Sequence, residues 1–518
     1  MNKPTYGTAD NRGPAAIPSP SGNVYPKESD SNYGTLKRVG LFLGPALFLA
    51  FLWLPLPWPG VPMQRLTAVL ALVIVYWMTE AIPLAATALF GPALCIVLGV
   101  APDREVLAAF GSPVIFKYIG MFFLTAAMQK HGLDRRLALA ILNLPIVSHS
   151  PWRVCGGLAF LSAALGMWMN PLSTTAVMLP IAIGVINTSR AIGRNPEARQ
   201  GLVLLIAYAA SIGGITTPVG TAPNIITVGH LQELTGARVS TIHWMLLALP
   251  LALILIGYLL WRLRPTLTRD EGDSVALARE FAQQQRDLGP LKPSEIATGL
   301  ALGGAIFLWL APGICELLGL DVRALGIDSI NDNMVGLFAG LVLFVVPTHL
   351  RRGEFVLSWR EGARIDWGTI MLAAGGLSLG ALIFSTGLAA AMGGGLSQIL
   401  KTTDISIVIA VGVVLSVAIS EIASNTAAAN VTVPLMIALS QSAGVDPVPV
   451  ALACAFGCTF WFMLPVSSGP NTLAYATGEV RVRGMMRHGL ALDVVGIVAI
   501  WLTVKLLSPL LDVMPKSL

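Results

Sequence analysis

The chain has 518 residues, a formal net charge of +5 and a composition dominated by apolar side chains. Hydrophobic residues make up 55% of the sequence and charged residues only 12%, whereas about a quarter of a soluble domain is charged. A mean hydropathy of +0.73 excludes an ordinary soluble protein and predicts a polytopic membrane protein. The positive charges lie mainly in loops and near the ends, so they do not indicate a nucleic-acid-binding face.

The apolar segments fall into two halves. Residues 1–36 are rich in Gly, Pro, Ser and Asn, which predicts a disordered cytoplasmic tail. The apolar runs that follow predict ten or eleven spanning helices in an all-α fold. The basic loop 262–295 separates a first half, 37–261, from a second half, 296–518, and the positive-inside rule makes this linker cytoplasmic. Within it, 276–285 is expected to form a surface helix.

Both halves carry the same polar motifs in the same order. Asn170–Pro180 aligns with Ser424–Pro434, and Pro218–Asn224 aligns with Pro465–Asn471. Two copies of a polar, helix-breaking motif inside apolar sequence are typical of secondary transporters, which bind solutes at interrupted helices near the membrane midplane. The sequence therefore predicts two inverted repeats and a chain that moves a solute.

A glycine-rich segment precedes the motifs in each half, at roughly 111–130 and 367–387. Segments of this length with small central residues suit re-entrant hairpins, whose backbone must be buried in protein or line a cavity. We expect both hairpins to lie beside the binding site.

An interrupted helix frees backbone groups that bind ions. Free carbonyl oxygens suit Na⁺, and amides at the start of the next half-helix suit an anion. A single Ser-Asn-Thr run can instead hold helices together, but four such elements in repeat register favour a binding site. A membrane-embedded enzyme is disfavoured because the sequence shows no nucleophile with a nearby base and no metal or cofactor motif. A channel would need a continuous polar stripe, whereas these motifs are compact.

Four segments resemble the divalent anion/sodium symporter family: Met78–Pro83, Gly213–Asn224, Glu421–Ala427 and Met463–Asn471. The resemblance covers roughly 39–510. It implies a homodimer in the cell membrane, here a bacterial inner membrane, in which a scaffold domain supports a transport domain that moves as an elevator. It also implies that Na⁺ flow is coupled to the uptake of di- or tricarboxylates or sulfate, although some members of the family exchange anions.

The same resemblance implies roles for individual residues. It assigns the anionic substrate to Ser424, Asn425, Thr426 and Ser468 in the second half and to Asn170, Ser173, Thr174 and Thr221 in the first. It assigns Na⁺ to Ser420, Ala423, Asn425 and Ser467 in the second half and to Gly220 in the first. Pro171 and Leu172 depart from the family's Ser-Asn-Thr, and this change removes the Asn amide expected at the first Na⁺ site.

Lys117 is a charged residue inside the first glycine-rich segment, where the second repeat has Leu372. A charge at membrane depth costs about 2.5 to 3.5 kcal/mol on insertion scales, so it indicates function. Either Lys117 reaches inward and replaces a Na⁺ beside the anion, or its ammonium extends to water from the mouth of the segment. We therefore predict a sodium-coupled anion symporter, with an exchanger that uses Lys117 as the alternative.

Overall fold

The computed structural model describes residues 34–54, 60–148, 150–264, 274–320, 331–400, 402–465 and 467–509. The predicted disordered tail lies outside the described residues as far as position 33, and the first helix begins at Thr35. The described chain is almost entirely helical and contains one small antiparallel sheet of two strands, in agreement with the all-α prediction.

Helices α1 to α13 make up the first half. Their bounds are α1 Thr35–Trp53, α2 Val61–Thr79, α3 Leu84–Val97, α4 Asp103–Ala108, the 3-10 helix η1 Ala109–Gly111, α5 Pro113–His131, α6 Leu133–Leu142, α7 Pro145–Ser148, α8 Pro151–Gly166, α9 Pro171–Thr188, α10 Arg190–Gly193, α11 Pro196–Ile215, α12 Ala222–Thr235 and α13 Thr241–Leu263. The charged linker holds α14 (Ser274–Asp287), which confirms the surface helix expected there. Its Leu277 and Phe281 are buried.

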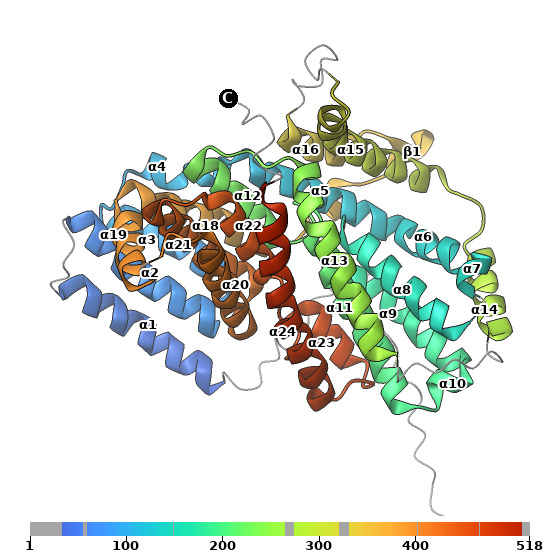
Figure 1. The fold of residues 1–518 in the computed structure, drawn as a ribbon. Coiled ribbons are helices and arrows are strands. Elements are labelled where there is room, and N and C mark those ends of the chain that lie inside the picture. Colours follow the sequence, from blue (N-terminus) through green and yellow to red (C-terminus); the bar gives the residue numbers. More distant parts are fainter. Residues whose placement is uncertain are drawn as a thin grey trace, which may run out of the picture.

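The second half contains the remaining elements. Their bounds are α15 Pro293–Leu317, α16 Asp332–Val342, β1 Pro347–His349, the 3-10 helix η3 Leu350–Arg352, β2 Glu354–Phe355, α17 Trp359–Gly362, α18 Trp367–Ser385, α19 Leu388–Leu400, α20 Ile405–Ile422, α21 Asn425–Ala443, α22 Pro447–Gly457, α23 Gly469–Ala476 and α24 Val482–Leu507. Figure 1 shows α1, α2, α3 and α19 gathered at one end of the molecule and α7 and α14 at the other.

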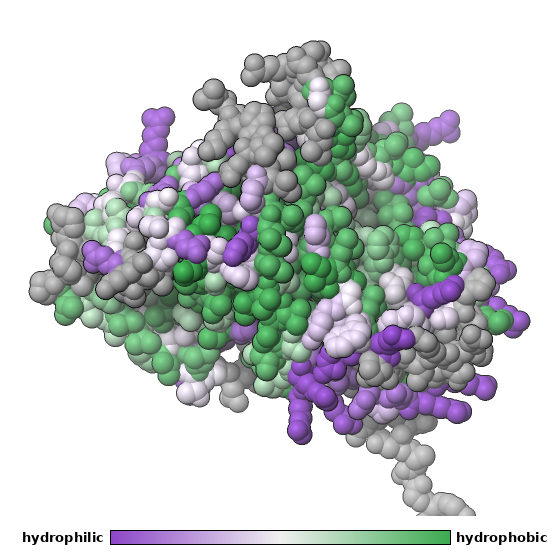
Figure 2. All heavy atoms as spheres, viewed as in Figure 1, coloured by the Kyte–Doolittle hydropathy of each residue, from purple (hydrophilic) through white to green (hydrophobic). Residues whose placement is uncertain are grey.

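Ten of the described helices are long and apolar enough to cross a bilayer, in agreement with the ten or eleven spans expected. Hydrophobic side chains cover the middle of the face shown in Figure 2, over α13 and α24. Leu253 and Ile254 of α13 and Val494 and Val498 of α24 are each more than half exposed. An apolar band of this kind suits contact with lipid. The chain is a multi-pass membrane protein.

Contacts between the halves occur in exchanged pairs. Helix α5 of the first half packs against α16 of the second half. In the repeat, α18 corresponds to α5 and α3 corresponds to α16, and α18 packs against α3. Helix α9 likewise packs against α23, while α21 packs against α12. Two copies related by a pseudo-two-fold axis must make each contact twice with the roles reversed. The paired contacts therefore support the predicted repeat.

Matching glycines allow two of these contacts. A Cβ atom on Gly120 of α5 would lie 2.1 Å from the Gly336 carbonyl oxygen of α16. A Cβ atom on Gly375 of α18 would lie 2.1 Å from the Ala88 carbonyl oxygen of α3. Small residues let helix backbones approach closely in membranes. The repeated glycines thus fix the positions of α5 and α18 against their partner helices.

The prediction of re-entrant hairpins at 111–130 and 367–387 is wrong. These residues belong largely to the continuous helices α5 and α18, which are both candidate spans. Their central glycines serve close helix packing instead of an interrupted backbone. The breaks in helical structure lie at the polar motifs themselves, between α8 and α9 and between α20 and α21.

We predict that Gly120→Ala and Gly375→Ala each destabilise the protein. The added methyl meets a backbone oxygen that cannot rotate away, and overpacking of this kind costs typically about 1–3 kcal/mol. Thermal unfolding of purified protein measures the loss. Gly257→Ala, where a Cβ atom meets nothing within 4 Å, is the matched control and should not lower the midpoint. Equal midpoints for all three variants would contradict the repeated close contact.

Candidate functional site

The first break lies between α8 and α9. Asn170 is the N-cap of α9, and its side-chain oxygen accepts a hydrogen bond from the Leu172 amide at 2.9 Å. Pro171 occupies the first helical position, where its missing amide hydrogen costs no hydrogen bond. Asn170 and Pro171 therefore start α9 after the break that follows Gly166 of α8.

The second break lies between α20 and α21. Ala423 has extended backbone angles, Ser424 is the N-cap of α21, and Asn425 begins that helix. The Asn425 side-chain oxygen accepts hydrogen bonds from the Thr426 amide at 2.7 Å and from the Thr426 hydroxyl at 3.1 Å. Just before the break, the Ser420 hydroxyl donates to the Cys458 carbonyl at 2.6 Å. The predicted second-half residues thus gather at one interruption.

The two Pro-Asn loops are built alike. Asn224 donates to the carbonyls of Gly214 at 2.9 Å and Thr217 at 2.7 Å, which precede it by ten and seven residues. In the other half, the Asn471 amide bonds the carbonyls ten and seven residues before it, at 2.9 and 3.0 Å. Both asparagines are fully buried. Each amide therefore ties its loop to the chain segment that precedes it.

Each of these asparagines also leaves its side-chain oxygen buried without a hydrogen-bond partner among the described residues. Sequence reasoning missed both residues, although the Pro-Asn pair stands at the same place in each aligned motif. The structure shows that each Asn bonds the carbonyls ten and seven residues before it, and the sequence alone does not reveal these partners.

Ser467 and Ser468 belong to the second loop. The Ser468 hydroxyl accepts from the Asn471 amide at 3.1 Å and caps α23, whereas the Ser467 hydroxyl oxygen is buried without a partner in the described chain. Val466, which directly precedes Ser467, lies outside the described residues.

Residues of the first break approach the end of α11 and the second Pro-Asn motif. A Cβ atom on Gly214 would lie 3.0 Å from the Pro171 ring, and one on Gly469 would lie 2.8 Å from the Leu172 side chain. Gly469 belongs to the second-half loop, so the first break and the second repeat meet here. Pro171 and Leu172 thus place apolar atoms where the second repeat has an amide and a hydroxyl.

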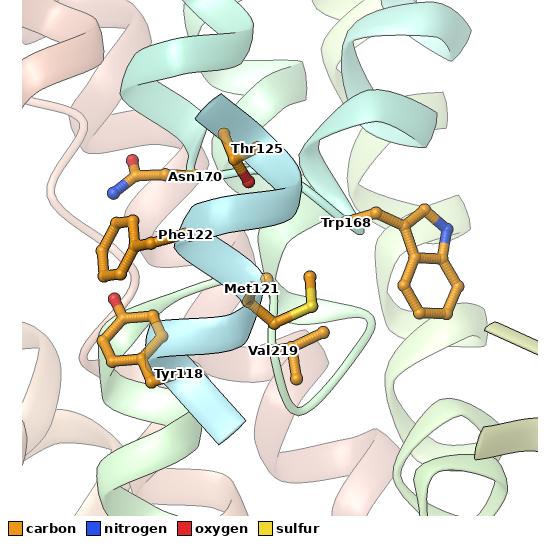
Figure 3. A pocket seen from close by; sticks show the side chains of 8 residues that line it. Tyr118, Met121, Phe122, Thr125, Trp168, Asn170 and Val219 are labelled. Carbon is orange, nitrogen blue, oxygen red and sulfur yellow. The ribbon is translucent and has the colours of Figure 1, made fainter. Parts of the chain in front are cut away.

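A cavity of about 10 Å³ lies beside the first break, shown in Figure 3. Its lining residues come from α5, the first break and the first Pro-Asn loop: Tyr118, Met121, Phe122, Thr125, Trp168, Asn170, Val219 and Gly220. This volume is close to the minimum that one water molecule requires. Anion binding here requires α5 or a loop to move.

Several hydroxyls near the first break are available for a ligand. Thr174 and Thr221 are buried, and their hydroxyl oxygens have no hydrogen-bond partner among the described residues. Ser173 is half-buried on the first turn of α9. Because buried polar groups are usually paired, these unpaired hydroxyls mark a polar site that the protein alone does not satisfy.

The Lys117 side chain is buried and faces the helices next to α5. Its ammonium nitrogen lies 3.9 Å from an Asp332 carboxylate oxygen and 5.3 Å from the centre of the Trp309 ring. The Trp309 indole donates to the Asp332 carbonyl at 2.9 Å. Lys117 does not line the cavity of Figure 3, although the next residue, Tyr118, does. Its 6% side-chain exposure also disfavours extension to water.

Two interrupted helices, each paired with a closed Pro-Asn loop and set in repeat symmetry, define a secondary transporter. Residues 36–512 match the family model described as the sodium:sulfate symporter transmembrane region. The chain therefore belongs to this family, which confirms the resemblance of its motifs. It is a multi-pass cell-membrane transporter and not an enzyme.

Sequence relatives share nearly the whole chain. The sodium-dependent dicarboxylate transporter SdcS of Staphylococcus saprophyticus is 29% identical over 497 residues, covering 93% of each chain. The protein of the same name from Staphylococcus aureus strain MRSA252 is 29% identical over 492 residues, covering 92% of each.

Two solved structures share the fold. The YdaH transporter of Alcanivorax borkumensis aligns with a TM-score of 0.53 at 13% identity, over 78% of this chain and 87% of that one. MtrF of Neisseria gonorrhoeae, which represents a class of antimetabolite efflux pumps, aligns with a TM-score of 0.53 at 15% identity, over 88% and 96%. At these identities the likeness concerns the fold alone.

We predict that Asn224→Ala and Asn471→Ala destabilise the protein to a similar degree. Each substitution leaves two buried loop carbonyls without their donor, and each such group costs about 1–3 kcal/mol. Thermal unfolding of the purified variants measures the effect. A variant with an unchanged midpoint would show that its loop is held by other contacts.

Proposed function

We propose that the protein is a sodium-coupled symporter of small di- or tricarboxylates. The observation that carries this proposal is the second break, where Ser424, Asn425 and Thr426 bring carbonyl, amide and hydroxyl groups to one interruption. The two staphylococcal relatives, which are named sodium-dependent dicarboxylate transporters, support the same ion and substrate class.

The Na⁺ site in this proposal is made of oxygen atoms at the second break and loop. Backbone oxygens of Ser420, Ala423 and Ser467 and the side-chain oxygen of Asn425 are its ligands. The Asn425 oxygen now accepts two hydrogen bonds from Thr426. Sodium binding would replace one of them, so occupation of the site would change the start of α21.

The anion site uses the starts of α9 and α21. Helix N-termini favour negative charge, and each repeat supplies one. Ser424, Thr426 and Ser468 act from the second half. Asn170, Ser173, Thr174 and Thr221 act from the first half. Two N-termini suit an anion with a carboxylate at each end, which favours a dicarboxylate over sulfate.

The first Na⁺ site, around Gly220, is weak or lost in this proposal. Pro171 offers no side-chain oxygen, and Leu172 packs towards Gly469 of the opposite loop. We therefore expect fewer sodium ions per substrate than in relatives that have Asn at both breaks.

The movement is proposed to be an elevator. Helix α9 packs against α23 and helix α21 against α12, so each break lies beside the loop helix of the other repeat. The two pairs are proposed to move together as one body. The scaffold role of the remaining helices and the homodimer rest on the family resemblance. The cytoplasmic position of 262–295 rests on the positive-inside rule.

Uptake into proteoliposomes tests this function. Labelled succinate, citrate and sulfate are offered with and without an inward Na⁺ gradient, and with or without unlabelled anion inside. Symport requires succinate or citrate uptake that depends on the Na⁺ gradient and needs no internal anion. Uptake that requires internal anion but not Na⁺ would identify an exchanger instead.

We predict that Asn425→Ala abolishes Na⁺-dependent uptake in a folded protein, because it removes a cation ligand. Ser424→Ala should raise the substrate dissociation constant, since a hydrogen bond to a charged group contributes about 1.5–3 kcal/mol, or roughly ten- to a hundredfold. Ser440→Ala is the control on the same helix, because its hydroxyl bonds only the local Met436 carbonyl in the described contacts. Normal Na⁺ affinity in Asn425→Ala would refute the assignment.

The exchanger stays a second candidate because Lys117 is buried in the half that lacks the sodium-site Asn. In that mechanism its ammonium replaces a Na⁺, which requires α5 to leave Asp332 during transport.

A double-mutant cycle distinguishes a structural role of Lys117, as the ion-pair partner of Asp332, from a role in anion binding. We predict that Lys117→Met destabilises the protein by at most about 3 kcal/mol, because the Asp332 side chain is 35% exposed and keeps part of its hydration. Lys117→Met with Asp332→Asn should recover most of that stability and retain substrate binding, measured by thermal shift with succinate. A stable double variant that no longer binds anion would favour the exchanger.

A further inference from the structure

The short β-hairpin formed by β1 and β2 is fixed to the end of α5, one of the candidate membrane spans. Lys130 and His131, in the last turn of α5, donate hydrogen bonds to the Val356 carbonyl at 3.0 and 2.8 Å. The Val356 amide donates to the Val346 carbonyl at 3.0 Å, which ties the end of β2 to the segment between α16 and β1. The hairpin therefore stands at the level where α5 leaves the bilayer.

The hairpin lies on the same side of the protein as the charged linker. Arg136 of α6, five residues after the end of α5, donates to the linker carbonyls of Leu288 at 3.1 Å and Gly289 at 2.9 Å. Figure 1 likewise shows β1 on the same side of the molecule as α14, the linker helix. The positive-inside rule assigns that side to the cytoplasm.

Large apolar side chains of this segment are exposed. Leu350, at the tip of the hairpin, is 79% exposed, and Trp359, which begins α17 just after β2, is 66% exposed. Phe355 of β2 is exposed as well. Tryptophan is enriched where membrane proteins meet the lipid headgroups, because its ring is apolar and its N–H is polar. These side chains suit the boundary between lipid tails and water.

The same segment carries more positive than negative charge. Residues 347–364 contain four arginines and two glutamates. Arg351, Arg352 and Arg360 are exposed and have no ion-pair partner in the described part of the chain. The glutamates, Glu354 and Glu361, each have a basic neighbour, at 3.3 and 2.8 Å. Anionic headgroups give the cytoplasmic leaflet a negative surface potential, so the arginines are complementary to it.

The backbone holds these side chains in a defined arrangement. Gly353 adopts a left-handed conformation, with φ of 63°, and turns the chain from η3 into β2. The Thr348 hydroxyl donates to the Glu354 carbonyl at 3.1 Å, across the two strands. Ser358 and Glu361 form a capping box that starts α17. The apolar and basic side chains are therefore presented together by a folded element.

We propose that the exposed apolar and basic side chains of the hairpin bind an anionic phospholipid of the cytoplasmic leaflet. This hairpin surface consists of Leu350, Arg351, Arg352, Phe355, Trp359 and Arg360. The guanidinium groups bind headgroup phosphates, and the apolar side chains enter the layer just beneath them. The bound lipid holds the ends of α5 and α16 at the membrane surface. The site is independent of the transported solute and of Na⁺, so it goes beyond the proposed symport.

A nitroxide attached to Leu350→Cys measures the depth of the hairpin in bilayers that contain the full-length protein. Oxygen concentrates in lipid and a nickel chelate stays in water, so their collision rates with the label report its depth. The protein is reconstituted in phosphatidylcholine with and without phosphatidylglycerol. Wild type taken through the same labelling corrects for the five native cysteines, four of which are buried. Gln283→Cys, at an exposed position of α14, is the reference for a label in water.

With phosphatidylglycerol, the ratio of oxygen to nickel collisions should be several-fold higher for the label on the hairpin than for the label on α14. Arg351→Gln with Arg352→Gln should shift the hairpin label towards water, and so should phosphatidylcholine alone. Arg190→Gln with Arg194→Gln, at α10, removes the same charge elsewhere and should leave the depth unchanged.

Three results would overturn the proposal. In the first, the hairpin label is as exposed to water as the reference in both lipids. In the second, it lies equally deep with and without phosphatidylglycerol, so the arginines do not select an anionic lipid. In the third, it is shielded from oxygen and from the nickel chelate alike, which would indicate that a second copy of the chain covers the hairpin.

Discussion

Every backbone group freed where a membrane helix stops must find a partner inside the protein, because lipid offers none. This constraint explains the asparagines of the duplicated motifs. Asn170 caps α9, the Asn224 amide donates to the Gly214 carbonyl near the end of α11, and the Asn471 amide donates to the Trp461 carbonyl in the segment after α22. In the proposed transport, buried hydroxyls that stay unpaired in the described chain, such as those of Thr174 and Thr221, bind the substrate.

The two repeats meet this constraint differently, and the difference bears on transport. The second break keeps Asn425 and Thr426, which bond each other and can be redirected to a ligand. The first break has Pro171 and Leu172, whose side chains pack towards Gly214 and the opposite loop. The second break is therefore polar, with hydrogen bonds that can be exchanged for a ligand. The first break is partly filled by apolar side chains. Such asymmetry is compatible with a common fold and a reduced number of bound cations.

The sequence predicted the spans, the duplicated motifs and the linker helix, because hydropathy and local patterning determine them. It predicted hairpins at 111–130 and 367–387 wrongly, since a glycine can signal an interrupted backbone or a close helix contact. Gly120 serves the second purpose, and only its neighbour Gly336 reveals this. The sequence also could not predict the ion-pair partner of Lys117, because Asp332 lies in the other half of the chain.

The most direct test of the asymmetry compares charge movement in the wild type with that in Pro171→Asn combined with Leu172→Thr. The ratio of net charge to labelled succinate is measured in proteoliposomes at fixed pH and voltage, where each charge crossing 100 mV contributes about 2.3 kcal/mol. The account predicts about one additional positive charge per succinate in the variant, because the substitutions rebuild the first Na⁺ site. An unchanged ratio in a folded, active variant would contradict it.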